Sequence, residues 1–189
     1  MNQLLSLRLF KEMSELQKVL DAKIKKREGI EYLPLQRIKS QITMESAECI
    51  NNMKGDFKYW SQKPALVKEL LEEFIDVLHF YISYTNHRLE YELADEKQAG
   101  EPPLPWQTLE HDYMELVEEY KNAVYLMKEK LIHDAADIVL ETPNPKQKVA
   151  YLFYIVAHYG LTERDIWAAY QEKNKINHDG IVIPDEVFN

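Results

Sequence analysis

The chain has 189 residues, of which 46% are hydrophobic, and carries a formal net charge of −9 at pH 7. This hydrophobic content excludes a disordered chain, and the acidic balance disfavours nucleic acid as a partner, because phosphate binding needs a basic face. The single cysteine, Cys49, excludes an internal disulfide and fits a reducing compartment. No apolar run approaches the roughly 18 residues of a membrane span and no signal-peptide pattern opens the chain, so we expect a cytoplasmic protein without a membrane partner.

Apolar side chains recur at helical spacing along most of the chain. Gly29 ends the first such segment, a turn at residues 61–64 separates the second from the third, and three prolines fall within residues 100–105, which we expect to be a linker. The predicted helices cover residues 4–26, 35–60, 65–93, 106–140, 146–159 and 163–177. No strand pattern is found, so the sequence predicts an all-α helical bundle. Its third helix should be central because it is apolar almost all round.

Two pairs of acidic residues flank the turn at residues 61–64: Glu45 and Glu48 before it, and Glu73 and Asp76 after it. Positions three apart share one face of a helix, so each pair presents two carboxylates together. An antiparallel hairpin would bring both pairs to nearly the same height, since each lies a similar number of residues from the turn. Four facing carboxylates form a site for a hard cation, because Mg²⁺ prefers oxygen ligands.

The alternative is that these acids lie on solvated helix faces. Glu73 stands seven residues from the apolar Leu66 and Phe80, which favours an inward position. Its neighbour Glu72 lies four residues from Lys68, where an ordinary ion pair would satisfy it. We therefore expect Glu73, and not Glu72, to be the ligand.

A second acidic set has the same spacing, with Glu115 and Glu118 followed by Asp134 and Asp137. No glycine or proline separates the two pairs, so we expect them on one continuous helix. The pairs would then lie about 24 Å apart and could not meet.

The pattern ExxE followed by ExxD at Glu45, Glu48, Glu73 and Asp76 resembles the MazG-like superfamily of nucleotide pyrophosphatases. Three further stretches are similar to the dimeric all-α dUTPases within it. They are LQKVLD at residues 16–21, FKYWS at residues 57–61 and YQEKNKIN at residues 170–177. The resemblance thus runs over nearly the whole chain.

This resemblance implies a homodimeric dUTP diphosphatase that converts dUTP to dUMP and pyrophosphate, limiting uracil in DNA and supplying dUMP. The four acids would be the catalytic metal ligands for Mg²⁺, with Mn²⁺ as an alternative, and the metals would activate a water for in-line attack. The family likewise implies substrate-binding side chains, with dUDP as a further candidate substrate. These are Gln17 at the base, Lys58 and Trp60 in the pocket wall, and Lys173 and Asn177 at phosphate and sugar.

We expect residues 1–189 to form a single dUTPase-like domain. Its metal-binding helical core covers about residues 35–95, its C-terminal helical half about 106–177, and its tail 178–189, which could fold back over the site or pack against the bundle. The tail departs from the family, because Gly180 stands where members carry an arginine that helps to hold the phosphates; Lys175 or His178 could compensate.

Two other functions fit the same residues. One is a MazG-like pyrophosphatase for dCTP or a modified nucleotide, since a glutamine can face uracil or cytosine by flipping its amide. The other is a non-enzymatic helical interaction module whose acids are structural. His79, three residues after Asp76, is the histidine closest to the acids and could support the site.

Overall fold

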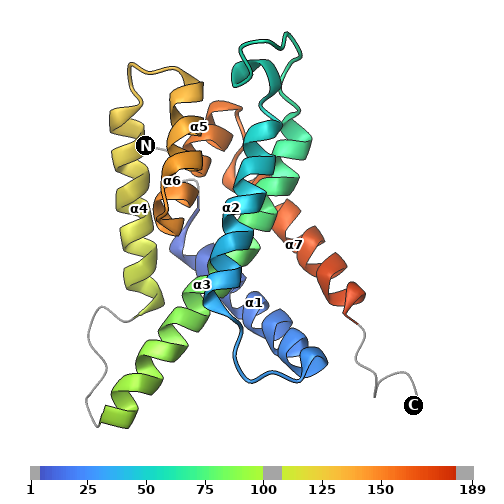
Figure 1. The fold of residues 1–189 in the computed structure, drawn as a ribbon, viewed down its shortest axis with the longest axis vertical. Helices are drawn as coiled ribbons and strands as arrows, with labels where there is room; N and C mark the ends of the chain where they lie inside the picture. The colour runs from blue at the N-terminus through green and yellow to red at the C-terminus, as the bar shows by residue number, and fades with distance from the viewer. Residues whose placement is uncertain (1–4, 100–107, 182–189) are drawn as a thin grey trace.

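The computed structural model describes residues 5–99 and 108–181, and of residues 92–99 it describes the backbone alone. These residues form helices and no strand, which confirms the all-α prediction (Figure 1). The elements in chain order are α1 (Leu7–Glu28), α2 (Leu35–Asn51), the short 3₁₀ helix η1 (Lys54–Asp56), α3 (Val67–Ala99), α4 (Leu109–Leu126), α5 (Ile132–Glu141), α6 (Pro145–His158) and α7 (Glu163–Gly180). The predicted linker at residues 100–105 and the tail beyond Ile181 lie outside the described residues.

The turn between α2 and α3 begins earlier than predicted. Helix α2 ends at Asn51, not near residue 60, because the chain doubles back on itself at Gly55. The Gly55 amide donates to the Lys63 carbonyl at 2.9 Å, and a Cβ on Gly55 would lie 2.8 Å from the Ser61 carbonyl oxygen. This close backbone approach requires glycine at position 55 and closes the hairpin that sets α2 against α3.

The predicted continuous helix over residues 106–140 is wrong, because α4 ends at Leu126 and α5 begins at Ile132. The break contains neither glycine nor proline. Instead, the Asp134 carboxylate accepts a hydrogen bond of 2.8 Å from the backbone N–H of Leu131, and this satisfies a free amide at the start of α5.

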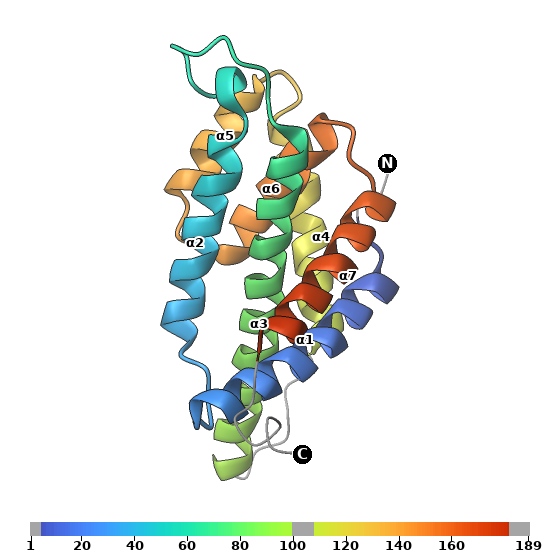
Figure 2. The same cartoon turned by 90° about the vertical axis from the view of Figure 1, so that its right-hand side faces the viewer.

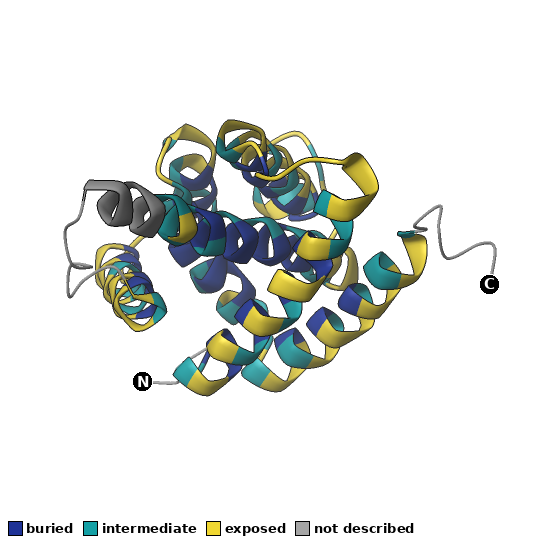
Figure 3. Cartoon of the chain, turned by 90° about the horizontal axis from the view of Figure 1, so that it is seen from below, coloured by how far each residue is buried: buried dark blue, intermediate teal, exposed yellow. Residues whose placement is uncertain are grey.

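Helix α3 lies in the middle of the bundle and packs against α1, α2, α4, α6 and α7 (Figures 1 and 3). It buries apolar side chains on several sides: Leu70, Phe74, Ile75, Val77, Leu78, Tyr81 and Ile82. The prediction of a central third helix is confirmed. The chain's own helices cover much of this surface, so its apolar character by itself does not call for a second copy.

Helix α7 lies alongside α1 and reaches α3 (Figure 2). Thr162 caps its N-terminus, since its hydroxyl accepts from the Asp165 amide and the Asp165 carboxylate accepts from the Thr162 amide at 2.8 Å. This cap fixes the starting direction of α7, which carries the predicted C-terminal site residues towards α3. None of the helices in the described ranges is long and apolar enough to cross a membrane.

Candidate metal centre and adjoining cavity

Three of the four predicted acids lie together on the hairpin of α2 and α3. Glu45 from α2 and Glu73 and Asp76 from α3 bring carboxylate oxygens within 4.8 Å of one another. The hairpin sets the two helices side by side, and the spacing of three between Glu73 and Asp76 places both on one face of α3. All three side chains are partly buried. Such a set of oxygen donors suits a hard divalent cation.

The electrostatics of this acid cluster show mutual repulsion. Burial raises the pKa of Glu45 to about 7, and the charges of Asp76, Glu48 and Glu73 add to the shift. Burial also raises the pKa of Glu73, and the charges of Glu48 and Asp76 act in the same direction. The fourth predicted acid, Glu48, is exposed and lies outside the group within 4.8 Å, yet its charge acts on both glutamates. A bound cation would offset this repulsion.

Lys173 on α7 places its positively charged ammonium group beside the acid cluster. Its Nζ lies 2.7 Å from Asp76 Oδ2, and its charge lowers the pKa of both Glu45 and Glu73. Lys173 and Asp76 are 97 residues apart in sequence, so the packing of α7 against α3 creates this contact. The lysine is thus an internal counterion for the acids.

Glu72, the neighbour of Glu73, and Glu115 of the second acidic set each form ion pairs away from the cluster. Glu72 pairs with Lys68 at 3.5 Å, as its spacing predicts. Glu115 forms ion pairs with Lys146 and His111. Within the described ranges, the group of Glu45, Glu73 and Asp76 is the one place where three metal-ligating side chains converge. In the part of the chain that the structure describes, the second acidic set therefore forms no metal centre, as we predicted. The reason that we gave was wrong, because its two pairs do not lie on one continuous helix.

A cavity of about 660 Å³ adjoins the acid cluster and extends between α1, α2, α3 and α7. Glu45 and Asp76 line it, and so do three of the five predicted substrate-binding residues: Gln17, Lys173 and Asn177. The other two do not. Lys58 donates to the Asn51 side chain, and Trp60 is 69% exposed in the turn between α2 and α3.

A buried polar network lies beneath the cavity at Gln17. The Gln17 amide contacts Asp21 and His79, and Asp21 also accepts from Ser83. Burial raises the pKa of Asp21, and hydrogen bonds from Gln17 and Ser83 oppose that shift. Burial lowers the pKa of His79 to about 3, with Lys173 and His178 adding to the effect, so the imidazole is neutral at pH 7. The ring stacks on Tyr170 with centroids 4.1 Å apart.

Sequence reasoning gave Asp21 and Ser83 no role and His79 a minor one. Helical spacing carries a faint signal for them, because Asp21 follows Gln17 by four residues and Ser83 follows His79 by four. The cavity is also lined by Arg27, Arg37 and Gly180, whereas the predicted compensating residues Lys175 and His178 do not line it.

Comparison with known proteins gives one result. A family model described as dUTPase matches residues 9–181, nearly the whole chain. Among curated proteins, none matches the chain.

Proposed function

Because the chain belongs to the dUTPase family and is a dUTP diphosphatase, which splits dUTP into dUMP and pyrophosphate, we propose that the acid cluster and the adjoining cavity are its active site. The observation that carries this proposal is that Glu45 and Asp76 line the same cavity as Gln17. A nucleotide with its base at Gln17 would extend its phosphates towards the carboxylates. The reaction would limit uracil in DNA and supply dUMP.

Glu45, Glu48, Glu73 and Asp76 suit Mg²⁺, with Mn²⁺ as an alternative, because hard cations take oxygen ligands. The raised pKa of Glu45 and of Glu73 supports this assignment, since it reflects crowded negative charge that a cation would offset. When bound, the cation supplies charge neutralisation for the phosphates and activation of the attacking water. These four side chains are therefore our candidates for both metal ligands and catalytic groups.

Lys173 and Asn177 are our candidates for holding the phosphates and the sugar. They lie one helical turn apart on α7, and both line the cavity. The Lys173 ammonium group is already at Asp76, so a phosphate beside the cluster would lie within its reach. Cleavage of a phosphoanhydride needs charge neutralisation and positioning more than a protein nucleophile. Cys49, which is buried and whose thiol pKa burial raises, has no part in the proposed reaction.

The base lies at Gln17 and His79 in this proposal. Both side chains are buried, both line the cavity, and the Nε2 atom of His79 has no hydrogen-bond partner among the described residues. An unpartnered polar atom in a buried position is costly unless a ligand satisfies it. Phe80 lines the same cavity and offers an aromatic surface for the ring of the base.

A homodimer remains our proposal for the assembly. Apolar side chains are exposed at two places at the same end of the bundle (Figures 1 and 2). They are Tyr59 and Trp60 in the turn after α2, and Tyr125, Leu126 and Leu131 at the end of α4 and in the turn that follows it. Apolar patches mark protein–protein interfaces, and we propose this end of the bundle as the contact between protomers. Lys58 and Trp60 do not line the cavity of their own chain, and we propose that they lie at the contact with the partner protomer.

The proposed assembly is tested by sedimentation at micromolar protein concentration. We expect a dimer for the wild type and a weakened dimer for Leu131→Lys, because the charge would enter the interface. A monomeric wild type with full activity would refute the dimer.

We also propose that residues 1–189 act as one domain, which the core cluster shared by α1 to α7 supports. We propose further that the protein is cytoplasmic.

The proposed function is tested with a panel of deoxynucleoside triphosphates and dUDP in the presence of Mg²⁺. We expect pyrophosphate release from dUTP at a kcat/KM at least about a hundredfold above that for dCTP. A preference for dCTP would favour the alternative substrate, and no pyrophosphate release from any of the nucleotides would contradict the proposal.

A further inference from the structure

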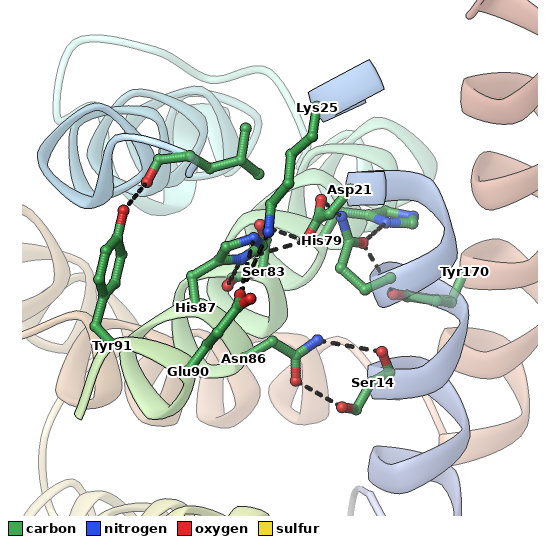
Figure 4. A network of polar contacts seen from close by, with 12 residues as sticks. Ser14, Asp21, Lys25, His79, Ser83, Asn86, His87, Glu90, Tyr91 and Tyr170 are labelled. Atoms are coloured by element: carbon green, nitrogen blue, oxygen red, sulfur yellow. Dashed lines mark hydrogen bonds and ion pairs between the residues drawn. The ribbon is translucent and has the colours of Figure 1, made fainter. Parts of the chain in front are cut away.

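The amide of Gln17 is held by a buried network that joins α1 to α3. Figure 4 shows Asp21, His79, Ser83 and Tyr170, which belong to this network. Gln17 Nε2 donates to Asp21 Oδ1 at 2.8 Å, and Ser83 Oγ donates to Asp21 Oδ2 at 2.8 Å. On its other side, Gln17 Oε1 lies 2.7 Å from His79 Nδ1 and 3.3 Å from the hydroxyl of Tyr170. All five side chains are buried. Both the NH₂ group and the oxygen of the Gln17 amide therefore have hydrogen-bond partners.

The Asp21 carboxylate allows one orientation of this amide. Asp21 accepts from both Gln17 and Ser83, and these hydrogen bonds, with the charges of His87 and Lys25, favour its ionised form against the effect of burial. An ionised carboxylate has only acceptor oxygens, so it faces the NH₂ group of Gln17. If the amide flipped, Gln17 Oε1 would face Asp21 Oδ1 at 2.8 Å, and two acceptors would oppose each other in a buried site. The flip that would let a free glutamine face either uracil or cytosine is thus unavailable to Gln17.

The orientation of Gln17 in turn decides which nitrogen of His79 carries the proton. Gln17 Oε1 is an acceptor, so His79 Nδ1 must donate to it, and Nε2 then presents a lone pair. The pKa of His79 is lowered to about 3, so the ring carries a single N–H at neutral pH. Both residues line the cavity, so a base placed against them would meet the second N–H of Gln17 and the lone pair of His79 Nε2.

This pair of groups matches uracil and opposes cytosine. The pairing edge of uracil places an N3–H donor between two carbonyl acceptors, so N3–H can donate to His79 Nε2 while a carbonyl accepts from Gln17. Cytosine has a bare N3 acceptor at that point, which would face the lone pair of His79 Nε2. Buried polar groups left opposed in this way give strong discrimination between substrates.

We infer that Asp21 is the positioning residue for base selection: by fixing the Gln17 amide it fixes the tautomer of His79, and so favours uracil over cytosine. This inference rests on the proposed function, because it assumes that the base lies at Gln17 and His79. The Asp21→Asn variant tests it, since the amide of asparagine can either accept from Gln17 or donate to it. Gln17 can then flip and His79 can take the other tautomer.

The first measurement is the ratio of kcat/KM for dUTP to kcat/KM for dCTP in the presence of Mg²⁺. We expect Asp21→Asn to lower this ratio at least about tenfold relative to the wild type. Asn86→Ala is the matched control: Asn86 pairs with Ser14 across the same two helices but does not line the cavity. We expect Asn86→Ala to keep the wild-type ratio. If the ratio falls equally in Asn86→Ala and Asp21→Asn, its cause is a general loosening of α1 against α3, and the inference is overturned.

The second measurement is the tautomer of His79, read from nitrogen-15 NMR of the imidazole. We expect protonated Nδ1 in the wild type, and a mixture of tautomers or protonated Nε2 in Asp21→Asn. Protonated Nε2 in the wild type would overturn the inference even if the variant does not fold. If the wild type prefers dUTP and Asp21→Asn retains that preference, this inference alone fails. If the wild type hydrolyses no dUTP, the proposed function fails.

Discussion

Two sets of acids in this chain have the same spacing and different surroundings. Glu45, Glu73 and Asp76 come from a hairpin that brings them together, with Glu48 exposed beside them. The pKa values of Glu45 and Glu73 are raised by burial and by the neighbouring charges. In the second set, Glu115 has its pKa lowered by the hydrogen bond from Lys146, and Asp134 caps the start of α5. The pattern of acids is thus informative only together with the pairing of the helices that carry it.

Glutamine substitutions in the two sets should separate them most strongly. We expect Glu73→Gln to lower kcat for dUTP by at least about a thousandfold, because it removes a charge that positions the cation. Glu115→Gln and Glu72→Gln should stay within about threefold of the wild type, because both residues form partly exposed ion pairs away from the cavity. Steady-state rates for the three variants check this. Equal losses in Glu73→Gln and Glu72→Gln would show that the wrong face of α3 was assigned.

Mg²⁺ should stabilise the protein, and the effect should grow with pH. The pKa of Glu45 rises from 4.5 to about 7 on folding. Between these values the folded state binds more protons than the unfolded state, so the free energy of unfolding of the metal-free protein falls as pH rises. Mg²⁺ binds the ionised acids and offsets the repulsion. We therefore expect a larger rise in Tm on adding Mg²⁺ at about pH 8 than at about pH 5.5, and an equal rise at both would contradict the assignment.

Removal of Lys173 should affect nucleotide and metal in opposite directions. Lys173→Ala removes the ammonium group beside Asp76, so we expect KM for dUTP to rise by about tenfold or more, the loss of one charge-assisted contact. Calorimetry without nucleotide should show tighter Mg²⁺ binding, because the internal counterion no longer competes for Asp76. Lys175→Ala is the matched control, since Lys175 lies on the same helix but does not line the cavity. Normal dUTP binding in Lys173→Ala would make this segment structural.

Gly180→Arg should give the smallest change, a several-fold tighter binding of dUTP. A Cβ at Gly180 meets no atom within 4 Å, and Gly180 lines the cavity, so a longer side chain has room there. The added guanidinium would restore the phosphate contact that the family pattern implies. Unchanged binding in calorimetry, with the fold intact, would show that the arginine at this position does not contribute in this chain.

The acid cluster could be predicted because it depends on local spacing and on one hairpin. Glu73 and Asp76 share a face of one helix, and a short turn joins that helix to the one that carries Glu45. The cavity could not be predicted from spacing alone, because α7 completes its walls and lies far in sequence from the other three helices, α1, α2 and α3. Gln17, Lys173 and Asn177 were assigned to it only through the resemblance to a family.

The errors in the fold have physical causes as well. The break after Leu126 depends on a side-chain cap from Asp134 and not on glycine or proline, so the usual markers of a break are missing. The early end of α2 depends on the contact of Gly55 with the backbone at Ser61. The importance of His79 depends on a tertiary hydrogen bond to Gln17.

The central claim is that the acid cluster holds a divalent cation required for the cleavage of dUTP. It is tested most directly by measuring pyrophosphate release from dUTP by the wild-type protein in excess chelator, followed by restoration with Mg²⁺ or Mn²⁺. We expect activity to be lost in the chelator and recovered with either ion. Full activity in excess chelator would contradict the account.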